Sequence, residues 1–159
     1  MKMHLEWSRP IPLKDGSREN LLCAVDLAKL PTAGGVYTFG RQRKDQDRNF
    51  EALYVGKANT IRRRVRGQLK NLPVMLHLKN ARQGRRLLLT AKFVGQPGQR
   101  AGKCIPIIER ALIRYFLSEG HDLVNKQGTR LRRHEIKSDG KHPKRFIPKQ
   151  MFVDRGRGE

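Results

Sequence analysis

A short apolar strand that leads directly into an arginine-rich helix is the feature that most constrains this chain. We expect the strand at Leu53–Gly56, and the link Lys57-Ala58-Asn59 joins it to the helix TIRRRVRGQL at residues 60–69. A similar run, GGVYTF at residues 34–39, predicts an earlier strand at Gly35–Gly40 that also carries a tyrosine near glycine. The polar stretch Arg41–Glu51 between the two runs favours a hairpin loop. The two strands should therefore be antiparallel partners that bring tyrosines and arginines together as a phosphate-handling surface.

The remaining segments predict an α+β fold, with a small, mainly antiparallel central sheet flanked by helices. One further strand is expected at Arg86–Val94. Helices are expected at Leu21–Leu30 (ended by Pro31), at Thr60 to about Leu72 with Asn59 as N-cap, at Pro73–Arg82, and at Ile105–Ser118 with Pro106 in its first turn and Gly120 after its end. The length of 159 residues suits one domain. The expected division is an N-terminal arm with a short helix (1–30), a core (31–128) and a basic C-terminal arm (129–159).

The charge of the chain indicates the class of its partner. There are 35 Lys and Arg against 14 Asp and Glu, a formal net charge of +21. Residues 52–108 contain no carboxylate but thirteen basic side chains. Such a balance favours a polyanion, so we expect a nucleic acid in preference to a membrane surface or an acidic protein. The candidate contacts are Arg62, Arg63, Arg66 and Lys70 in the basic helix and Arg130, Arg132 and Arg133 in the C-terminal arm. For that arm, a solvated tail or a strand packed on the core is an equal alternative.

Cysteine and histidine usage argues against a disulfide framework and a zinc site. Cys23 and Cys104 are the only cysteines, and two thiols in a reducing cytosol are the simplest interpretation. The five histidines show no metal-ligand spacing. The N-terminus has no apolar signal-peptide core, and no run approaches the length of a membrane span. We therefore expect a cytoplasmic protein that does not bind membranes.

The spacing in the basic helix separates its core face from its charged face. At about 100° per residue, Ile61, Val65, Leu69 and Leu72 form one apolar stripe. Arg63, Arg66 and Lys70 point away from this stripe, towards solvent or a nucleic acid. Arg62 and Arg64 lie on the two flanks of the stripe. Periodicity leaves them as equal candidates for a half-buried functional arginine. The alternative is that all four arginines of the helix contact phosphates or merely solubilise the protein.

Glu109 is the first carboxylate after the acid-free stretch, and it lies in the helix expected at Ile105–Ser118. The buried face of that helix should comprise Ile105, Ile108, Ala111, Leu112, Tyr115 and Phe116, with Glu109 at its rim. No basic residue stands three or four positions away to pair with it. A carboxylate at an apolar rim needs either a tertiary basic partner or a metal ion. Both alternatives stay open, and Mg²⁺ is a cation that takes one or two carboxylates and completes its shell with water.

These residues together resemble the signature of the GIY-YIG nuclease superfamily. The two signature tripeptides stand here as Gly35-Val36-Tyr37 and Tyr54-Val55-Gly56. Arg64 follows the second tyrosine by ten residues, Glu109 lies on a later helix, and Asn125 follows that helix. The resemblance covers roughly residues 31–128, and its specificity comes from five features in the right order.

The resemblance implies a metal-dependent endonuclease with one catalytic ion. It implies that Glu109 binds Mg²⁺ or Mn²⁺, that Tyr37 is the general base for the attacking water and that Tyr54 positions water or phosphate. It further implies that Arg64, rather than Arg62, stabilises charge on the phosphoryl oxygens. Two more residues complete the implied site: Lys57 would depress the pKa of the base or neutralise phosphate, and Asn125 would hold the site together.

One position departs from the pattern, because Gln68 stands where many members of the superfamily have histidine or tyrosine. Glutamine can hydrogen-bond a water or a phosphate but is not a base at neutral pH, so the base role shifts to Tyr37. The leading expectation is a DNA endonuclease of the restriction, repair or mobile-element type, with RNA as an alternative substrate and a homodimer as a possible assembly. The alternatives are a non-catalytic nucleic-acid-binding module with the same fold, which Gln68 favours, and an interbacterial nuclease toxin.

Overall fold

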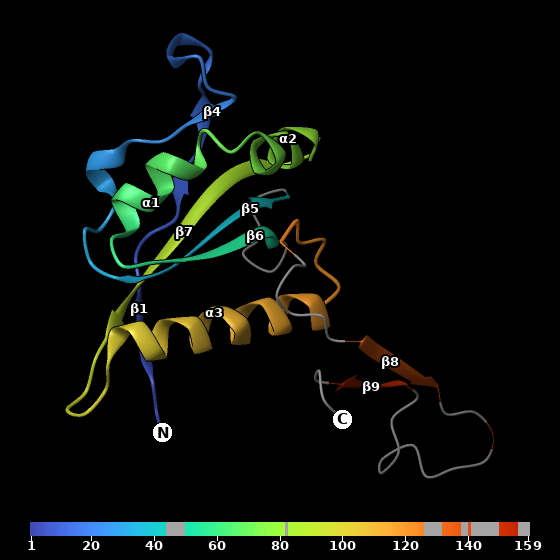
Figure 1. Ribbon diagram of the computed structural model, residues 1–159. Coiled ribbons are helices and arrows are strands. Elements are labelled where there is room, and N and C mark those ends of the chain that lie inside the picture. Colours follow the sequence, from blue (N-terminus) through green and yellow to red (C-terminus); the bar gives the residue numbers. More distant parts are fainter. Residues whose placement is uncertain (44–49, 82, 126–131, 138–139, 141–149, 156–159) are drawn as a thin grey trace. The chain divides into compact units, whose positions relative to one another are not determined.

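The computed structural model describes residues 1–43, 50–81, 83–125, 132–137, 140 and 150–155 (Figure 1). The chain forms two compact units, Met1–Asn125 and Lys126–Glu159. In the second unit, strands β8 (Arg132–Lys137) and β9 (Gln150–Arg155) pair as an antiparallel two-stranded sheet. The rest of the fold belongs to the first unit.

An antiparallel sheet forms the centre of the first unit. Its strands are β1 (His4–Trp7), β2 (Ile11–Pro12), β5 (Gly35–Gln42), β6 (Phe50–Ala58) and β7 (Arg85–Val94). The order is β1-β7-β5-β6, and β2 also pairs with β7. The two tyrosine-bearing strands are neighbours, as predicted, with Tyr37 opposite Gly56 and Phe39 opposite Tyr54. They extend beyond the predicted limits, and the pair Arg41–Glu51 forms a cross-strand salt bridge of 2.7 Å instead of lying in the loop.

Helices cover both faces of this sheet. Helices α1 (Ile61–Gln68) and α2 (Leu72–Asn80) lie on one face, and α3 (Ala101–Ser118) lies on the other (Figure 1). The predicted α+β class with a mainly antiparallel sheet is therefore confirmed. Because side chains alternate along a strand, β5 serves both faces. Tyr37 and Phe39 join the α1/α2 core, whereas Val36 packs against α3.

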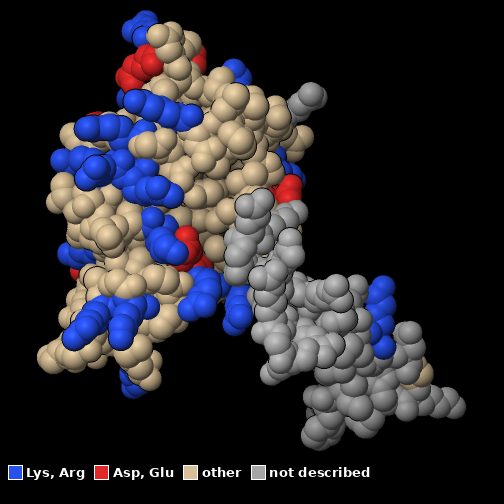
Figure 2. Space-filling model, in the orientation of Figure 1, with Lys and Arg blue, Asp and Glu red and all other residues tan. Residues whose placement is uncertain are grey.

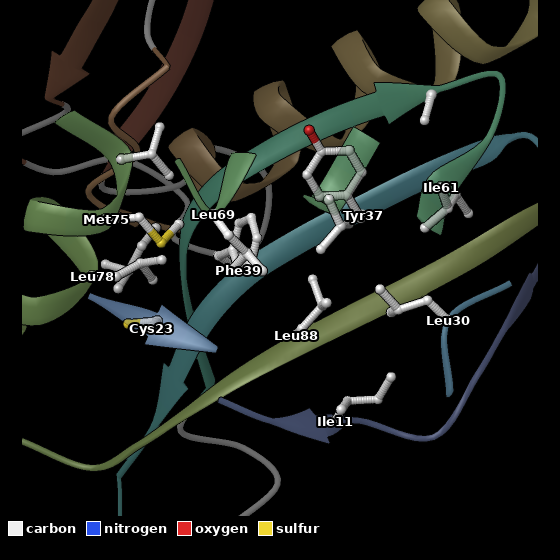
Figure 3. Packing of buried hydrophobic residues seen from close by; sticks show 14 residues of the cluster. Ile11, Cys23, Leu30, Tyr37, Phe39, Ile61, Leu69, Met75, Leu78 and Leu88 are labelled. Atoms are coloured by element: carbon white, nitrogen blue, oxygen red, sulfur yellow. The ribbon is translucent and has the colours of Figure 1, made fainter. Parts of the chain in front are cut away.

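Figure 3 shows the larger core cluster, between the sheet and helices α1 and α2. Tyr37 and Phe39 stand at its centre, and their rings meet edge to face at 5.8 Å between centroids. Ile61, Met75 and Leu88 are all at most 1% exposed and close the cluster from α1, α2 and β7. The buried tyrosine thus belongs to the main core as well as to the signature strand.

The N-terminal segment differs from the expectation of an arm with a short helix. Strands β1 and β2 extend the central sheet, and residues 1–30 belong to the same compact unit as the rest of the first 125 residues. The helix predicted at Leu21–Leu30 is wrong: the segment holds β4 (Cys23–Ala24), which pairs with β3 (Lys14–Asp15), and a 3₁₀ turn at Leu27–Lys29. Another 3₁₀ turn spans Ser17–Glu19. The Asp26 side chain accepts a hydrogen bond from the Ala28 N–H at 3.2 Å and so caps the turn in place of a longer helix.

Helix α1 begins and ends differently from the prediction. Its N-cap is Thr60, not Asn59, and no side-chain cap bond is present there. Instead, the N–H groups of Ile61 and Arg62 donate to the carbonyls of Ala33 and Pro31, at 3.1 and 3.0 Å. The helix ends at Gln68, so Leu72 starts α2 and is 58% exposed instead of belonging to the apolar stripe.

Helix α3 is longer than predicted at its N-terminal end. It starts at Ala101, which places Pro106 inside the helix, not in its first turn. Its end agrees with the prediction, because Gly120 has a φ of +84° and the N–H of His121 donates to the Phe116 carbonyl. The buried face is rotated from the expected one: it includes Cys104 and Ile113, whereas Ala111 is exposed and Tyr115 is 58% exposed.

A segment after α3 covers the outer edge of β6. The N–H of Val124 donates to the Leu53 carbonyl at 2.8 Å, and Nδ1 of His121 accepts from the Ala52 N–H at 2.8 Å. Burial lowers the pKa of His121, which agrees with a neutral ring that accepts this bond. An uncovered edge strand would expose unpaired N–H and C=O groups, and this segment pairs several of them.

Candidate functional site

A cleft of about 710 Å³ opens between α1 and α3 at the edge of β6. Three elements and the link after β6 form its walls. The lining residues that matter here are Tyr54 and Lys57 from β6, Arg63, Arg64 and Gly67 from α1, and Gly102, Pro106 and Glu109 from α3. The structure therefore brings together Tyr54, Lys57, Arg64 and Glu109, four of the seven residues expected in the catalytic site.

The two signature tyrosines have different environments. Their ring centroids are 6.1 Å apart, but Tyr54 is half-buried and lines the cleft, whereas Tyr37 is fully buried. The Tyr37 hydroxyl lies over Gly56, where a Cβ would collide with it. Glycine in the second tripeptide is thus required by the tyrosine of the first.

The Tyr37 phenol is held in its neutral form. Burial, above all, raises its pKa well above the usual value, and the neighbouring Tyr54 adds to this effect. Among the described residues, none gives the Tyr37 hydroxyl a hydrogen bond of ordinary geometry, although Gln68 and Arg64 lie close enough to oppose the rise of its pKa. Both facts disfavour the role of general base that the resemblance implies for Tyr37.

The structure separates the two candidate arginines that periodicity could not distinguish. The Arg62 guanidinium donates to the backbone carbonyls of Leu30, at 2.8 and 3.1 Å, and of Ala28, at 3.2 Å. It therefore ties α1 to the N-terminal segment. Arg64 lines the cleft, and its pKa is raised, chiefly by its closeness to the Tyr37 hydroxyl. Arg64 is the arginine that can reach a ligand.

Glu109 has a tertiary partner. Its Oε2 lies 2.8 Å from the Lys57 Nζ, and the Glu109 side chain is 17% exposed. This pair satisfies the requirement for a basic partner, which is a lysine here. No group of three or more metal-ligating side chains occurs in the described part of the chain. The donor set suits an ion of the Mg²⁺ type, which takes one protein carboxylate together with phosphate and water.

Gln68 is buried and already engaged within the protein. It is 5% exposed; its Nε2 donates to the Tyr54 hydroxyl at 2.9 Å and its Oε1 accepts from Asn71 Nδ2 at 3.0 Å. The sequence suggested that Gln68 could contact a water or a phosphate directly. In the structure Gln68 contacts Tyr54 instead, and Tyr54 is the residue of this pair that lines the cleft. Sequence reasoning missed Asn71, whose only signal was its place as N-cap before Pro73.

Asn125 holds the middle of the second tripeptide. Its Oδ1 accepts from the Val55 N–H at 3.2 Å, and its Nδ2 donates to the Val55 carbonyl. The side-chain amide thus imitates a neighbouring strand at the residue between Tyr54 and Gly56. This position agrees with the structural role that the resemblance implies.

Basic side chains surround the cleft. Figure 2 shows Lys and Arg gathered over α1 and along α3 on this face, with acidic atoms between the two groups. Arg63 and Arg66 are exposed on α1 and Lys70 is exposed just after it, as predicted, and Lys103 and Arg110 are exposed on α3. Arg130 lies outside the described residues, and for Arg132 and Arg133 the structure gives only their place in β8.

Three further findings do not concern the cleft. Both cysteines are buried free thiols, and no helix in the described residues is long and apolar enough to cross a membrane. Comparison of the chain with protein-family models, curated proteins and solved structures gives no match. The function must therefore be inferred from the residues and geometry of the cleft.

Proposed function

We propose that this protein is a metal-dependent DNA endonuclease with a GIY-YIG-like fold, which hydrolyses phosphodiester bonds. One observation carries the proposal: Tyr54, Arg64 and Glu109 come from β6, α1 and α3 and line the same cleft. These are the residues to which the resemblance assigns positioning, charge stabilisation and metal binding. Their convergence from distant parts of the sequence supports a shared chemical role.

The arrangement of the two tripeptides supports the same assignment. Gly35-Val36-Tyr37 and Tyr54-Val55-Gly56 lie on adjacent antiparallel strands, and a basic helix follows the second strand. Tyr37 packs on Gly56 across the hairpin, and Asn125 pairs with Val55. Each of the five matching features thus has a contact with, or a place in, the candidate site.

The chemistry of the cleft suits phosphodiester hydrolysis. Glu109 would hold Mg²⁺ or Mn²⁺, and the ion, when bound, supplies polarisation of a phosphoryl oxygen. The Arg64 guanidinium is placed to stabilise negative charge on the phosphate. The Lys57 ammonium group lies beside Glu109. When Glu109 binds a metal ion instead, Lys57 would become available to a phosphate group. Buried Tyr37 acts in this proposal as the support of Arg64 and Gly56, not as the base.

The substrate class follows from charge. The chain has a net charge of +21, with Arg63 exposed in the wall of the cleft and with Arg66 and Lys70 exposed elsewhere on α1 and just after it. This charge is suited to a nucleic-acid backbone. Such contacts give affinity without sequence information. We propose DNA as the substrate, with RNA as the alternative that the experiment below distinguishes.

A non-catalytic nucleic-acid-binding module is the second candidate. The Lys57–Glu109 pair favours it, because Glu109, the one carboxylate among the described residues that line the cleft, already has a cationic partner. This candidate predicts salt-sensitive binding without cleavage in any divalent metal.

The test is incubation of the purified protein with supercoiled plasmid, single-stranded DNA and RNA, each in Mg²⁺, Mn²⁺ or EDTA. The proposal predicts nicking or cutting of DNA that requires the metal. Discrete fragments indicate a restriction-like enzyme, whereas a smear with toxicity on expression indicates a toxin. Cleavage of RNA alone overturns the choice of substrate, and binding without cleavage in both metals establishes the binding module instead.

A further inference from the structure

A chain of three hydrogen bonds leads from the first turn of α2 to the hydroxyl of Tyr54. The Val74 N–H donates to Asn71 Oδ1 at 3.5 Å, Asn71 Nδ2 donates to Gln68 Oε1 at 3.0 Å, and Gln68 Nε2 donates to Tyr54 at 2.9 Å. Asn71 is the N-cap of α2 and Gln68 is the last residue of α1. Because Gln68 is only 5% exposed, water has little access to compete for its amide.

The direction of every bond in this chain is fixed from one end. A backbone N–H can only donate, so Asn71 must turn its oxygen to Val74 and its NH₂ group to Gln68. An NH₂ group can also only donate, so Gln68 must turn its oxygen to Asn71 and its own NH₂ to Tyr54. The helix N-terminus therefore sets the orientation of both side-chain amides.

This direction decides what Tyr54 offers to the cleft. Its oxygen accepts the Gln68 N–H, so its own hydrogen can bond to another acceptor. The Tyr37 hydroxyl is close, but no described residue gives it a hydrogen bond of ordinary geometry. Tyr54 lines the cleft together with Arg64, so its hydrogen is available to a group bound there. The non-bridging oxygens of a phosphodiester are hydrogen-bond acceptors. A Tyr54 hydroxyl that accepts from Gln68 can donate its hydrogen to such an oxygen. A Tyr54 hydroxyl that donates its hydrogen to Gln68 cannot.

We propose that Asn71 is a positioning residue which, through Gln68, sets the Tyr54 hydroxyl as a hydrogen-bond donor to a phosphoryl oxygen of bound DNA. The proposal rests on the nuclease function proposed above. The proposal also gives a role to Gln68. Its primary amide has one acceptor and one donor group, so the orientation imposed by Asn71 determines which group faces Tyr54. Asn71 itself does not touch the substrate.

Two substitutions separate this role from that of helix capping. Asn71→Ser and Asn71→Asp both keep a good N-cap oxygen for α2, and neither carries the NH₂ group that fixes Gln68. In Asn71→Asp the carboxylate attracts the Gln68 NH₂, which leaves the Gln68 oxygen facing Tyr54 and reverses the direction. In Asn71→Ser the orientation of the Gln68 amide is no longer fixed by residue 71. Asn80→Asp, at the exposed far end of α2, is the control for the added charge.

The first measurement needs no enzymatic activity. The C–O stretching band of ring-¹³C-labelled tyrosine distinguishes a hydroxyl that accepts from one that donates, and the difference from Tyr54→Phe assigns the Tyr54 band. In the full chain of the wild type and of Asn80→Asp, we expect the Tyr54 hydroxyl to accept a hydrogen bond from Gln68. In Asn71→Asp we expect the Tyr54 hydroxyl to donate one to Gln68. An unchanged Tyr54 band in Asn71→Asp overturns the proposal. This result stands even where the wild type cleaves nothing, so failure of the nuclease function is recognised separately.

The second measurement is a double-mutant cycle on plasmid cleavage. Asn71→Asp should lower kcat about tenfold, as expected for one hydrogen bond made to the transition state, with little change of KM and with Asn71→Ser intermediate. In a Tyr54→Phe background, Asn71→Asp should have no further effect. An equal loss in both backgrounds overturns the proposal, because it shows that Asn71 acts independently of Tyr54.

Discussion

The Nζ of Lys57 lies 2.8 Å from the Oε2 of Glu109, across the cleft between β6 and α3. The Lys57 side chain is 48% exposed, so solvent screens the pair, and such pairs contribute at most about 1 kcal/mol to stability. Glu109 is therefore not essential to the fold. The nuclease proposal accounts for its position in the cleft by a metal ion that replaces the ammonium group as the partner of the carboxylate.

Removal of Lys57 should expose this competition. Lys57→Gln should bind Mn²⁺ several-fold more tightly than the wild type in the absence of DNA, because the charge that occupies the Glu109 carboxylate is gone. Titration calorimetry measures the change. Lys92→Gln, which breaks the exposed Lys92–Glu6 pair instead, is the matched control and should leave the affinity unchanged. Equal Mn²⁺ affinities of Lys57→Gln and the wild type would show that Lys57 and the metal do not compete.

Tyr37→Phe should stabilise the protein. The substitution removes a buried hydroxyl that lacks a hydrogen bond of ordinary geometry among the described residues, which should gain about 1 kcal/mol at neutral pH. The gain should grow as the pH rises above about 10, because Tyr37 then ionises in the unfolded wild type while burial keeps it protonated in the folded state. Urea unfolding between neutral and alkaline pH tests both parts. A stability difference that shrinks above this pH contradicts the assignment.

The same variant tests the role of Tyr37 in catalysis. If Tyr37 only supports Arg64 and Gly56, Tyr37→Phe should retain more cleavage activity than Tyr54→Phe, because Tyr54 lines the cleft and Tyr37 does not. The reverse order of activities would restore the role of general base to Tyr37.

Asn125→Ala should destabilise the protein by about 1–3 kcal/mol, because it leaves both polar groups of Val55 without their side-chain partner. Hydrogen exchange should show the loss locally, at the Val55 amide. Asn125→Asp keeps the acceptor for the Val55 N–H but places a carboxylate against the Val55 carbonyl, so it should be no better than alanine. Unchanged protection of Val55 in the alanine variant contradicts the structural role.

Gly67→Ala should separate stability from activity. A Cβ at Gly67 meets no atom within 4 Å, so alanine should stabilise α1 by up to about 1 kcal/mol. Because Gly67 lines the cleft, the same methyl group should weaken DNA cleavage. Gly35→Ala is the contrasting variant: its Cβ would collide with the Ala91 carbonyl and should destabilise the sheet. Full activity in Gly67→Ala would show that this wall of the cleft does not approach the DNA.

Local sequence patterns predicted the elements that depend on local physics. The two tyrosine strands, β7 and the main helices were found because their apolar spacing agrees with their final environment. The pattern failed where tertiary contacts decide. LLCAVDLAKL has helical spacing, but its backbone pairs with β3 and its buried residues are Cys23 and Leu30. Likewise, the carbonyls of Pro31 and Ala33 satisfy the first N–H groups of α1, which no local signal reveals.

The sequence predicted which residues line the candidate site but not the contacts between them. The resemblance selected Tyr54, Arg64 and Glu109, and these residues line one cleft. It could not show that Tyr37 would be buried, because the two tripeptides say nothing about the depth of either tyrosine. Nor could it find Lys57 as the partner of Glu109, or Asn71, since both depend on contacts between segments distant in the sequence or across a helix boundary.

The most direct test of the nuclease proposal is the rate of plasmid cleavage by Glu109→Gln in Mg²⁺ and in Mn²⁺. Glutamine keeps the size of the side chain but loses the charge that holds the ion, so the rate should fall about 10²–10³-fold while the unfolding midpoint stays close to that of the wild type. Glu119→Gln, exposed at the end of the same helix, is the matched control and should cleave normally. Cleavage by Glu109→Gln at the wild-type rate would contradict the proposal.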